Sequence, residues 1–346
     1  MSDNTSEVPR GIHADAVTQW ILDHVEGLEA PFTFALITGG HSNLTYSVDD
    51  AAGRRIVLRR PPLGAVLATA HDMGREHRII SALVPTDMPV PRTLAHCDDE
   101  SVNDAPFYLM DYVEGVVLAT AQTVQDSVPE GQREALGERV IEVLATLHSI
   151  DPDDVGLGKL GRKDGYIERQ LKRWSIQWEK SKTRELPAME NVHRLLEERV
   201  PEQIGSAVVH GDYRLGNMLV TPDDAGVAAV LDWELCTLGD PMADVGYLMN
   251  DWAPPGSEGV QLTGSPTSAG GFPSRERMME RYAELTGRDT SLVPYYRAFQ
   301  AWRLAAIGEG VLARYLKGVM GGEGDTEGMK KSVETRAELA LELLEA

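Results

Sequence analysis

The chain has 346 residues, of which 33 are Lys or Arg and 54 are Asp or Glu, so its formal net charge at pH 7 is −21. Hydrophobic residues make up 42% and charged residues 25%, which is ordinary globular usage and excludes wholesale disorder or a fibrous repeat. The negative charge excludes the basic footprint that non-specific nucleic-acid binding needs, and it disfavours an anionic membrane surface. At roughly 150 residues per domain, the length predicts about two domains.

The cysteine content and the N-terminal stretch indicate the compartment. Cys97 and Cys236 are too few for a disulfide framework and belong to no zinc-ligand cluster, which favours a reducing compartment. The first twenty residues are polar and acidic and lack the basic-then-apolar order of a signal peptide. No run of 18 apolar residues is present. We therefore expect a cytoplasmic protein without a membrane partner.

The first third of the chain predicts a small sheet with helices beside it. Apolar residues at helical spacing indicate a helix over about 14–28, and a second helix is expected around 70–84. Strands are predicted over 32–37, 43–48, 54–60, 92–97 and 106–112. Strands gathered at the front with helices after them favour an α+β fold over alternating βαβ units.

From about residue 116 onward the pattern becomes mostly helical. Helices are predicted over 131–149, 162–183, 187–200, 240–251, 274–287, 292–318 and 328–346. Short strand-like pieces are expected at 207–210, 218–221 and 227–233. Residues 253–274 hold Pro, Gly and Ser with little periodicity, and we predict a loop that is either a plain linker or a lid over a pocket.

Two short motifs carry the strongest functional signal. The first, HGDYRLGN at 210–217, places Asp212 and Asn217 at the spacing of the base and the magnesium-ligating Asn in a protein-kinase catalytic loop. Arg214 falls where that loop carries a basic residue near the transferred phosphoryl group. The second motif, DWE at 232–234, follows an apolar run as the kinase DFG triplet does. Asn217 and Asp232 offer the oxygen ligands that Mg²⁺ prefers.

Other interpretations of these residues are weaker. The motifs alone would also fit an ordinary turn and a strand end. His210 and Asp212 form an HxD pair, but an iron site of that type needs a second His downstream, and the chain has none after His210. The glycines at 156–163 mimic a P-loop without its Lys-Ser/Thr pair. His148, Asp240 and Asp244 are expected to be structural, the two aspartates holding the loop after Asp232.

The two motifs resemble those of the aminoglycoside phosphotransferase and choline-kinase-like superfamily, relatives of the protein kinases. The resemblance runs from about residue 32 to 320. Further stretches are most similar to the bacterial phosphotransferases that resemble the kinase-like domain of some acyl-CoA dehydrogenase fusions: GGHSNLTY at 39–46, GYIERQLKRW at 165–174, LDWELCTLGDPMADVGYLM at 231–249 and WRLAAIGEGVLAR at 302–314. This implies an α+β, bilobal protein-kinase-like fold. A small antiparallel-sheet N-lobe, 1–112, would cover the nucleotide. A larger, mainly helical C-lobe, 113–346, would hold the catalytic loop, the metal site and the substrate region.

The resemblance also implies nucleotide-binding residues in the first lobe. The turn between the first two strands would cover the phosphates with backbone N–H groups. Its candidate residues are Gly39, Gly40, Ser42 and Asn43. The third strand should present a Lys to the phosphates, and Arg59 stands there with Glu76 as its helix partner. Arg keeps the positive charge in a forked geometry. Adenine would lie against Met110 and bond to the backbone of 111–113, with Asp111 and Val113 as candidates.

The implied activity is transfer of the γ-phosphoryl group of ATP to a hydroxyl of a small molecule, with Mg²⁺ as cofactor. Asp212 would accept the proton, Asn217 and Asp232 would hold Mg²⁺, and Arg59 and Arg214 would offset developing charge. The alternative is a catalytically inactive kinase-fold protein that binds a nucleotide, which only Arg59 favours. The acceptor would be an aminoglycoside or amino alcohol, or instead a hydroxyacyl-CoA-like anionic metabolite.

One segment bears on the acceptor. Residues 162–184 hold eight basic and three acidic side chains, a local charge of +5, which leaves −26 on the rest of the chain. The total charge of the chain therefore gives no reason to expect a cationic substrate. The segment is either a solvated helix face, with basic side chains over Trp174 and Trp178, or an anion-binding wall near the acceptor.

Overall fold

The chain folds into two compact units. The computed structural model describes residues 8–37, 43–64, 71–257, 265–319 and 324–345. The first unit holds Met1–Glu114 and also takes in a later segment, Ala228–Glu234; the second holds Gly115–Val227 and Leu235–Ala346. The sequence prediction had placed everything after residue 112 in one lobe. Ala228–Glu234 groups with the first unit, where Asp232 also forms an ion pair with a strand residue; the predicted lobes, 1–112 and 113–346, stay a prediction.

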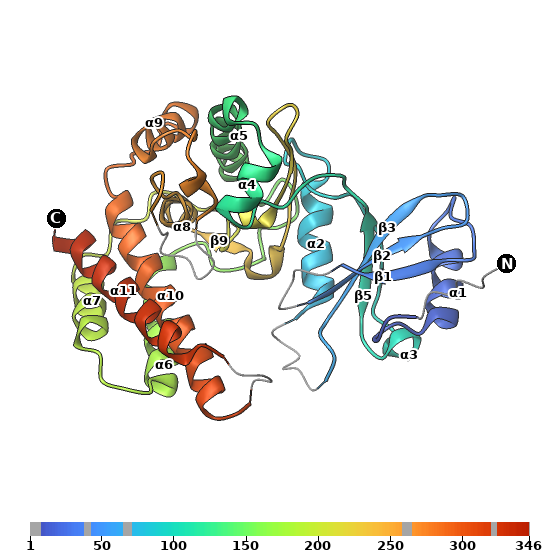
Figure 1. Ribbon diagram of the computed structural model, residues 1–346, viewed down its shortest axis with the longest axis horizontal. Coiled ribbons are helices and arrows are strands. Elements are labelled where there is room, and N and C mark those ends of the chain that lie inside the picture. Colours follow the sequence, from blue (N-terminus) through green and yellow to red (C-terminus); the bar gives the residue numbers. More distant parts are fainter. Residues whose placement is uncertain (1–7, 38–42, 65–70, 258–264, 320–323, 346) are drawn as a thin grey trace. The chain divides into compact units, whose positions relative to one another are not determined.

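The first unit is built on an antiparallel sheet of five strands in the order β1-β2-β3-β5-β4 (Figure 1). The strands are β1 Thr33–Leu36, β2 Leu44–Asp49, β3 Arg55–Arg60, β4 Thr93–Cys97 and β5 Phe107–Asp111. Helix α1, Ala14–His24, packs Val17 and Ile21 into a core that includes Leu58 of β3. Because successive side chains of a strand point to opposite faces, Arg59 faces away from this core. It faces α2, Met73–Leu83, where Glu76 contacts it.

Two helices of the first unit, α2 and α3, begin at aspartate caps. The Asp72 carboxylate accepts a hydrogen bond from the Arg75 N–H at 2.8 Å and starts α2. The Asp99 carboxylate likewise accepts from the Ser101 N–H and starts α3, Glu100–Asn103. Such caps satisfy N–H groups that the first helical turn leaves unpaired. The cap therefore fixes where α2 begins, one turn before Glu76.

The second unit is mainly helical. Its helices are α4 Ala121–Ser127, α5 Glu130–Ser149, α6 Tyr166–Ser181, α7 Pro187–Glu198, α8 Met242–Asp251, α9 Arg275–Thr286, α10 Val293–Leu316 and α11 Thr326–Glu345. Helix α10 is buried over most of its length and packs against α6, α8 and α11. Strand β6, Ala207–Val209, pairs antiparallel with β9, Thr237–Gly239. Strands β7, Met218–Thr221, and β8, Gly226–Val230, form another two-stranded sheet, and the division between the units falls within β8, after Val227. The predicted α+β class is confirmed.

Several elements differ from the prediction. Helices α3 and α4 and strand β9 were not predicted, because each is only three to seven residues long. Strand β8 ends at Val230 instead of Trp233, since Asp232 has a φ of 65° and a 3₁₀ turn follows at Trp233–Leu235. Within the predicted loop, Pro266–Ala269 forms a short 3₁₀ helix. Residues 258–264 of that loop lie outside the described residues.

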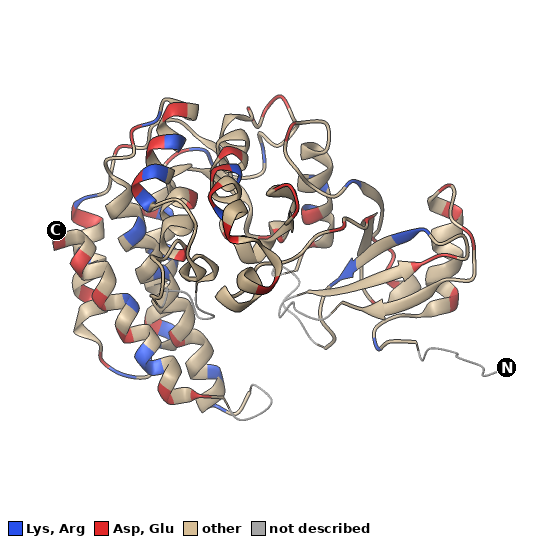
Figure 2. Ribbon diagram, turned by 45° about the horizontal axis from the view of Figure 1, so that its top comes forward, with Lys and Arg blue, Asp and Glu red and all other residues tan. Residues whose placement is uncertain are grey.

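Charge and thiols are distributed over both units. Asp and Glu occur on helices and loops of each unit (Figure 2). Each unit also holds one buried cysteine, Cys97 in the first and Cys236 in the second, and neither forms a disulfide. Among the helices in the described ranges, none combines the length and the apolar character needed to cross a membrane.

Candidate active site

The predicted catalytic loop lies between β6 and β7 in the second unit. The Asn217 amide nitrogen donates hydrogen bonds to the backbone oxygen and to Oδ2 of Asp212, both at 2.8 Å. Asp212 Oδ1 accepts no hydrogen bond from the described residues and lies 3.4 Å from Arg214 Nε. The three residues that the motif predicted therefore lie together. Asn217 thus fixes Oδ2 of Asp212, whereas Oδ1 faces the Arg214 guanidinium and accepts no hydrogen bond within the described residues.

A buried carboxylate, Asp244 of α8, holds this loop. Its two oxygens accept from separate backbone amides, Oδ2 from His210 at 2.6 Å and Oδ1 from Gly211 at 2.8 Å. Burial alone would raise the pKa of Asp244, but the hydrogen bonds that it accepts, first of all the one from His148, outweigh burial and lower the pKa, so the group is a carboxylate. Asp244 is structural as expected, but it holds the loop before Asp212 and not the one after Asp232.

Gly211 has a conformation that other residues rarely adopt. Its φ is 85°, and a Cβ atom there would lie 3.0 Å from the backbone oxygen of Leu235. Left-handed backbone and close approach both favour glycine. The glycine of the HGD motif therefore has a steric reason to be present.

A second carboxyl near Asp212 was not predicted. Asp251, the last residue of α8, is 1% exposed, and its Oδ1 has no hydrogen-bond partner in the described part of the chain. Burial raises the pKa of Asp251 to about 7; the Arg214 charge opposes this shift and the Asp212 charge adds to it. The same two charges act on Tyr247, whose pKa lies well above its usual value mainly through burial. Asp251 therefore belongs to the surroundings of the catalytic loop.

The pKa of Asp251 predicts a pH-dependent stability. The unfolded carboxyl titrates near 3.9 and the folded one near 7, so between these values the folded state keeps a proton that the unfolded state has lost. The resulting penalty grows as the pH rises through this window. We expect the stability gain from Asp251→Asn to increase by about 2 to 3 kcal/mol between pH 5 and pH 8. Urea denaturation across this range measures it; a gain independent of pH would contradict the shifted pKa.

In the first unit, Arg59 is held by two carboxylates. Its Nε lies 3.1 Å from Glu76 Oε1, and its Nη2 lies 2.8 Å from Asp232 Oδ1. Burial alone would lower the pKa of Arg59, but Glu76, Tyr108 and Asp232 outweigh it and raise the pKa. The structure thus brings together the predicted pair and one predicted metal ligand. The role of Arg59 in binding a nucleotide remains a prediction.

Asn43 takes part in a network that the sequence did not predict. Its side-chain nitrogen donates to Glu234 Oε2 at 3.3 Å, and its oxygen lies 2.8 Å from His71 Nδ1. Arg75 donates to the Glu234 backbone oxygen at 3.2 Å. Asn43 is buried. The other candidates of the same turn, Gly39, Gly40 and Ser42, lie outside the described residues.

The structure around β5 bears on which backbone groups could bind adenine, as predicted from the resemblance. Met110 is buried and pairs with Val57 in the sheet. The Asp111 N–H donates to the Arg92 backbone oxygen at 2.8 Å, so this N–H is already used within the first unit. Its carboxylate pairs with Arg92 and Arg54. The Asp111 N–H is therefore excluded as a donor to the base, and the backbone contact expected from 111–113 otherwise stays a prediction.

The predicted basic segment does not form one continuous wall. Lys163 pairs with Asp153, Lys182 with Glu179 and Arg184 with Glu309. Lys172 is exposed, and the Arg173 guanidinium lies over the Trp174 ring at 5.2 Å. Lys180 lines a groove. The basic side chains of α6 that form no ion pair within the described residues are therefore spread along the helix, and one of them, Lys180, lies in the groove.

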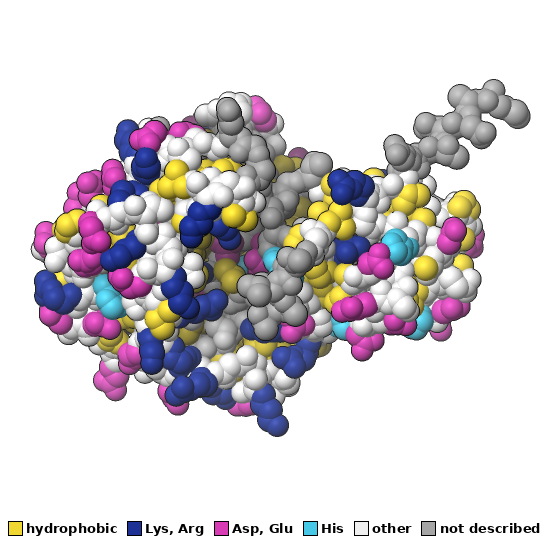
Figure 3. All heavy atoms as spheres, turned by 90° about the horizontal axis from the view of Figure 1, so that it is seen from below, with side chains coloured by type: hydrophobic (Ala, Val, Ile, Leu, Met, Phe, Trp, Pro, Cys, Tyr) yellow, Lys and Arg dark blue, Asp and Glu magenta, His cyan; other side chains and the backbone are white. Residues whose placement is uncertain are grey.

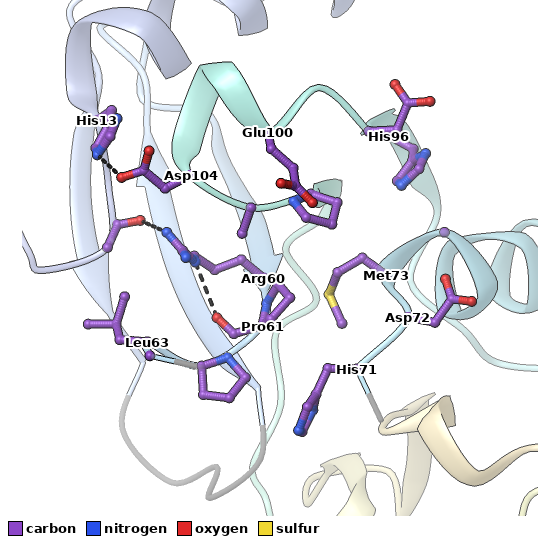
Figure 4. Close-up of a pocket in the computed structure, with 17 residues that line it drawn as sticks. His13, Arg60, Pro61, Leu63, His71, Asp72, Met73, His96, Glu100 and Asp104 are labelled. Atoms are coloured by element: carbon purple, nitrogen blue, oxygen red, sulfur yellow. Dashed lines mark hydrogen bonds and ion pairs between the residues drawn. The ribbon is translucent and has the colours of Figure 1, made fainter. Parts of the chain in front are cut away.

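A different cavity lies in the first unit. It measures about 780 Å³ and is bordered by the start of α2, the end of β3 and the segment before β5 (Figure 4). The buried Arg60 guanidinium donates to the backbone oxygens of Gly11, Asn103 and Pro61 there, while His13 pairs with Asp104. No predicted site residue in the described ranges lines this cavity.

The sheet with its Arg–Glu pair, the helical unit and the loop that joins Asp212 to Asn217 define a protein-kinase-like fold. Residues 33–305 match the model of the phosphotransferase enzyme family, and the chain belongs to that family. The family resemblance predicted from the motifs is confirmed.

Known proteins agree with this assignment. A Ralstonia eutropha structure assigned to the aminoglycoside phosphotransferases superposes with a TM-score of 0.81 at 33% identity, covering 96% of this chain and 98% of that one. An aminoglycoside phosphotransferase in complex with ADP and hygromycin B has a TM-score of 0.59 at 16% identity, covering 95% and 98%. Acyl-CoA dehydrogenase family member 10 of Mus musculus is 36% identical over 87% of this chain. The chain spans 28% of the length of that relative.

Proposed function

We propose that this chain is an ATP- and Mg²⁺-dependent phosphotransferase that moves the γ-phosphoryl group to a hydroxyl of a small molecule. One observation carries the proposal: Asn217 holds Asp212 by two hydrogen bonds in a loop that Asp244 fixes through two backbone amides. Phosphoryl transfer depends mainly on positioning and charge stabilisation, and a rigid carboxylate beside an arginine supplies both.

Each predicted residue has a role in this proposal. Asp212 Oδ1 orients the acceptor hydroxyl and takes its proton, while Arg214 offsets charge on the transferred group. Asn217 and Asp232 fit Mg²⁺, because the Asn217 nitrogen is engaged by Asp212 and its amide oxygen remains as an acceptor. Magnesium, when bound, neutralises charge on the phosphates. Within the described residues no three His, Cys, Asp or Glu side chains form a metal cluster, so the phosphates would complete the ligand set.

The second candidate is a catalytically inactive protein that binds a nucleotide. The ion pair between Arg59 and Asp232 favours it, because that pair engages a proposed metal ligand with a guanidinium. Mg²⁺-dependent ATP turnover by the purified chain would count against this candidate. Nucleotide binding without turnover in any acceptor screen would support it.

For the acceptor we propose a hydroxyacyl-CoA-like anionic metabolite over an aminoglycoside or amino alcohol. The support is the name of the relatives at 36% identity, together with a groove lined by the cations Lys180, Arg303, Arg314 and Lys317. The test is an ADP-release assay with kanamycin, choline and 3-hydroxybutyryl-CoA. Turnover with the CoA ester alone is expected; turnover with kanamycin alone would overturn the choice of acceptor while leaving the phosphotransferase in place.

The role of Arg59 predicts a difference between two substitutions. Arg59→Met should raise the KM for ATP by about tenfold or more, since a positive charge at the phosphates is lost, whereas Arg59→Lys should keep it within about threefold. Steady-state kinetics measure both. Arg55→Met on the same strand is the matched control, because Arg55 is exposed and pairs with Asp49. An unchanged KM in Arg59→Met would remove Arg59 from the phosphate contact.

A further inference from the structure

A groove in the second unit is lined by cations. It measures about 390 Å³ and is bordered by residues of α6 and α10. Lys180, Arg303, Arg314 and Lys317 line it, Trp174 adds an aromatic ring, and none of its lining residues in the described part of the chain is acidic. We call it the α6–α10 groove. The chain has 54 acidic and 33 basic residues, so the lining of this groove has the opposite sign of charge to the chain as a whole.

Nearby carboxylates do not neutralise the groove. Glu179 of α6 is engaged by Lys182 at 3.2 Å. Glu309 of α10 is engaged by Arg184 at 2.8 Å and by the Thr183 N–H. Within the described ranges, the two lining lysines and Arg314 form no ion pair with a carboxylate. Lys and Arg side chains gather on this face of the second unit (Figure 3). The groove therefore carries a net positive charge.

Arg303 places a buried guanidinium in the groove. Its side chain is buried, and its guanidinium donates to the Gly211 backbone oxygen at 3.1 and 3.2 Å and to Gln300 at 2.9 Å. It lies over the rings of Trp174 and Tyr247. Its Nε has no hydrogen-bond partner among the described residues. A buried cation without a carboxylate partner is costly, and a bound anion would offset that cost.

The groove also adjoins the catalytic loop. Arg303 and Leu235, both of which line it, contact Gly211, the residue directly before Asp212. A volume of about 390 Å³ lies within the range of small-molecule sites, about 300 to 1,000 Å³. A ligand anchored in the groove by an anionic end is therefore held beside the residue that precedes the proposed base.

We propose that the α6–α10 groove binds a phosphate-class anionic group of the acceptor. That the bound molecule is the acceptor rests on the proposed phosphotransferase function. The binding of the anion itself does not depend on turnover. The groove thus makes the charge of the acceptor, not only its hydroxyl, a determinant of specificity. Arg303 serves as a positioning residue, because it links the anion site to the backbone of the catalytic loop.

The test is calorimetric titration of the full chain, saturated with ADP, with adenosine 3′,5′-bisphosphate as the probe. Lys180→Glu together with Lys317→Glu should weaken probe binding by about tenfold or more, because two attractive charges become repulsive. The matched control is Lys172→Glu with Lys331→Glu, which reverses two exposed lysines outside the groove and should change binding by less than about twofold.

Three results would overturn the inference. They are absence of probe binding to the wild type, an equal loss in both double variants, and a loss that follows Arg59→Met instead of the groove pair. The last would place the probe at the nucleotide site. An acceptor screen without any turnover would count against the proposed function, whereas the titration decides the anion site on its own.

Discussion

Replacing Asp212 with Asn should lower kcat by about a thousandfold while ATP binding stays within about twofold of the wild type. The substitution keeps the shape of the side chain and its contact to Asn217, but it removes the carboxylate that would accept the proton of the acceptor. Asp212 Oδ1 accepts no hydrogen bond from the described residues, and it is the atom proposed to take the proton. Turnover kinetics and calorimetric ATP titration measure the two quantities.

Asp224→Asn is a suitable control for this prediction. Asp224 lies at the β7–β8 turn in the same unit, is exposed and accepts hydrogen bonds from Thr221 and the Gly226 N–H. Its substitution should leave kcat unchanged. If Asp212→Asn retained more than about a tenth of the activity, Asp212 would not be the base.

The second large effect is expected for Asp244→Asn. An amide has one oxygen, so its NH₂ group would face a backbone N–H of His210 or Gly211, and one buried donor would lose its partner. We expect the free energy of unfolding to fall by about 2 to 4 kcal/mol and kcat to fall with it, because the loop that carries Asp212 is released. Chemical denaturation and hydrogen exchange of the two amides report these effects separately.

Asp240→Asn separates loop positioning from stability. Asp240 is also buried near the start of α8, and its oxygens accept from the Tyr296 hydroxyl and the Met242 N–H, not from the catalytic loop. Its substitution should destabilise the second unit without a comparable loss of kcat. Equal kcat losses in the two variants at equal destabilisation would show that Asp244 has no special connection to Asp212.

The part of the site that could be predicted is local in sequence. Asp212 and Asn217 are five residues apart, and their contact follows from a turn whose residues are read together. Asp251 lies 34 residues after Asn217, and its significance comes from burial at the end of α8, which has no local sequence signal. Arg303 contacts Gly211 from 92 residues away. Its stretch was recognised by resemblance, but no pattern indicated the contact.

The fold shows the same limit. Long periodic helices such as α5 and α10 were predicted near their observed positions, because their apolar spacing is repeated over several turns. Strand β9 has three residues and exists only because it pairs with β6. The left-handed conformation of Asp232, which ends β8 early, depends on surroundings that include Arg59 in a distant strand. Such features are set by tertiary contacts.

The two buried cysteines give each unit its own chemical reporter. Cys97 lies in the first unit and Cys236 in the second, and burial raises the pKa of the Cys97 thiol, so a thiol reagent reaches it only when the unit opens. Labelling rates followed by mass spectrometry, with Cys97→Ala and Cys236→Ala to assign the signals, would measure the opening of each unit separately. Protection of one thiol by a ligand would then tell which unit that ligand stabilises.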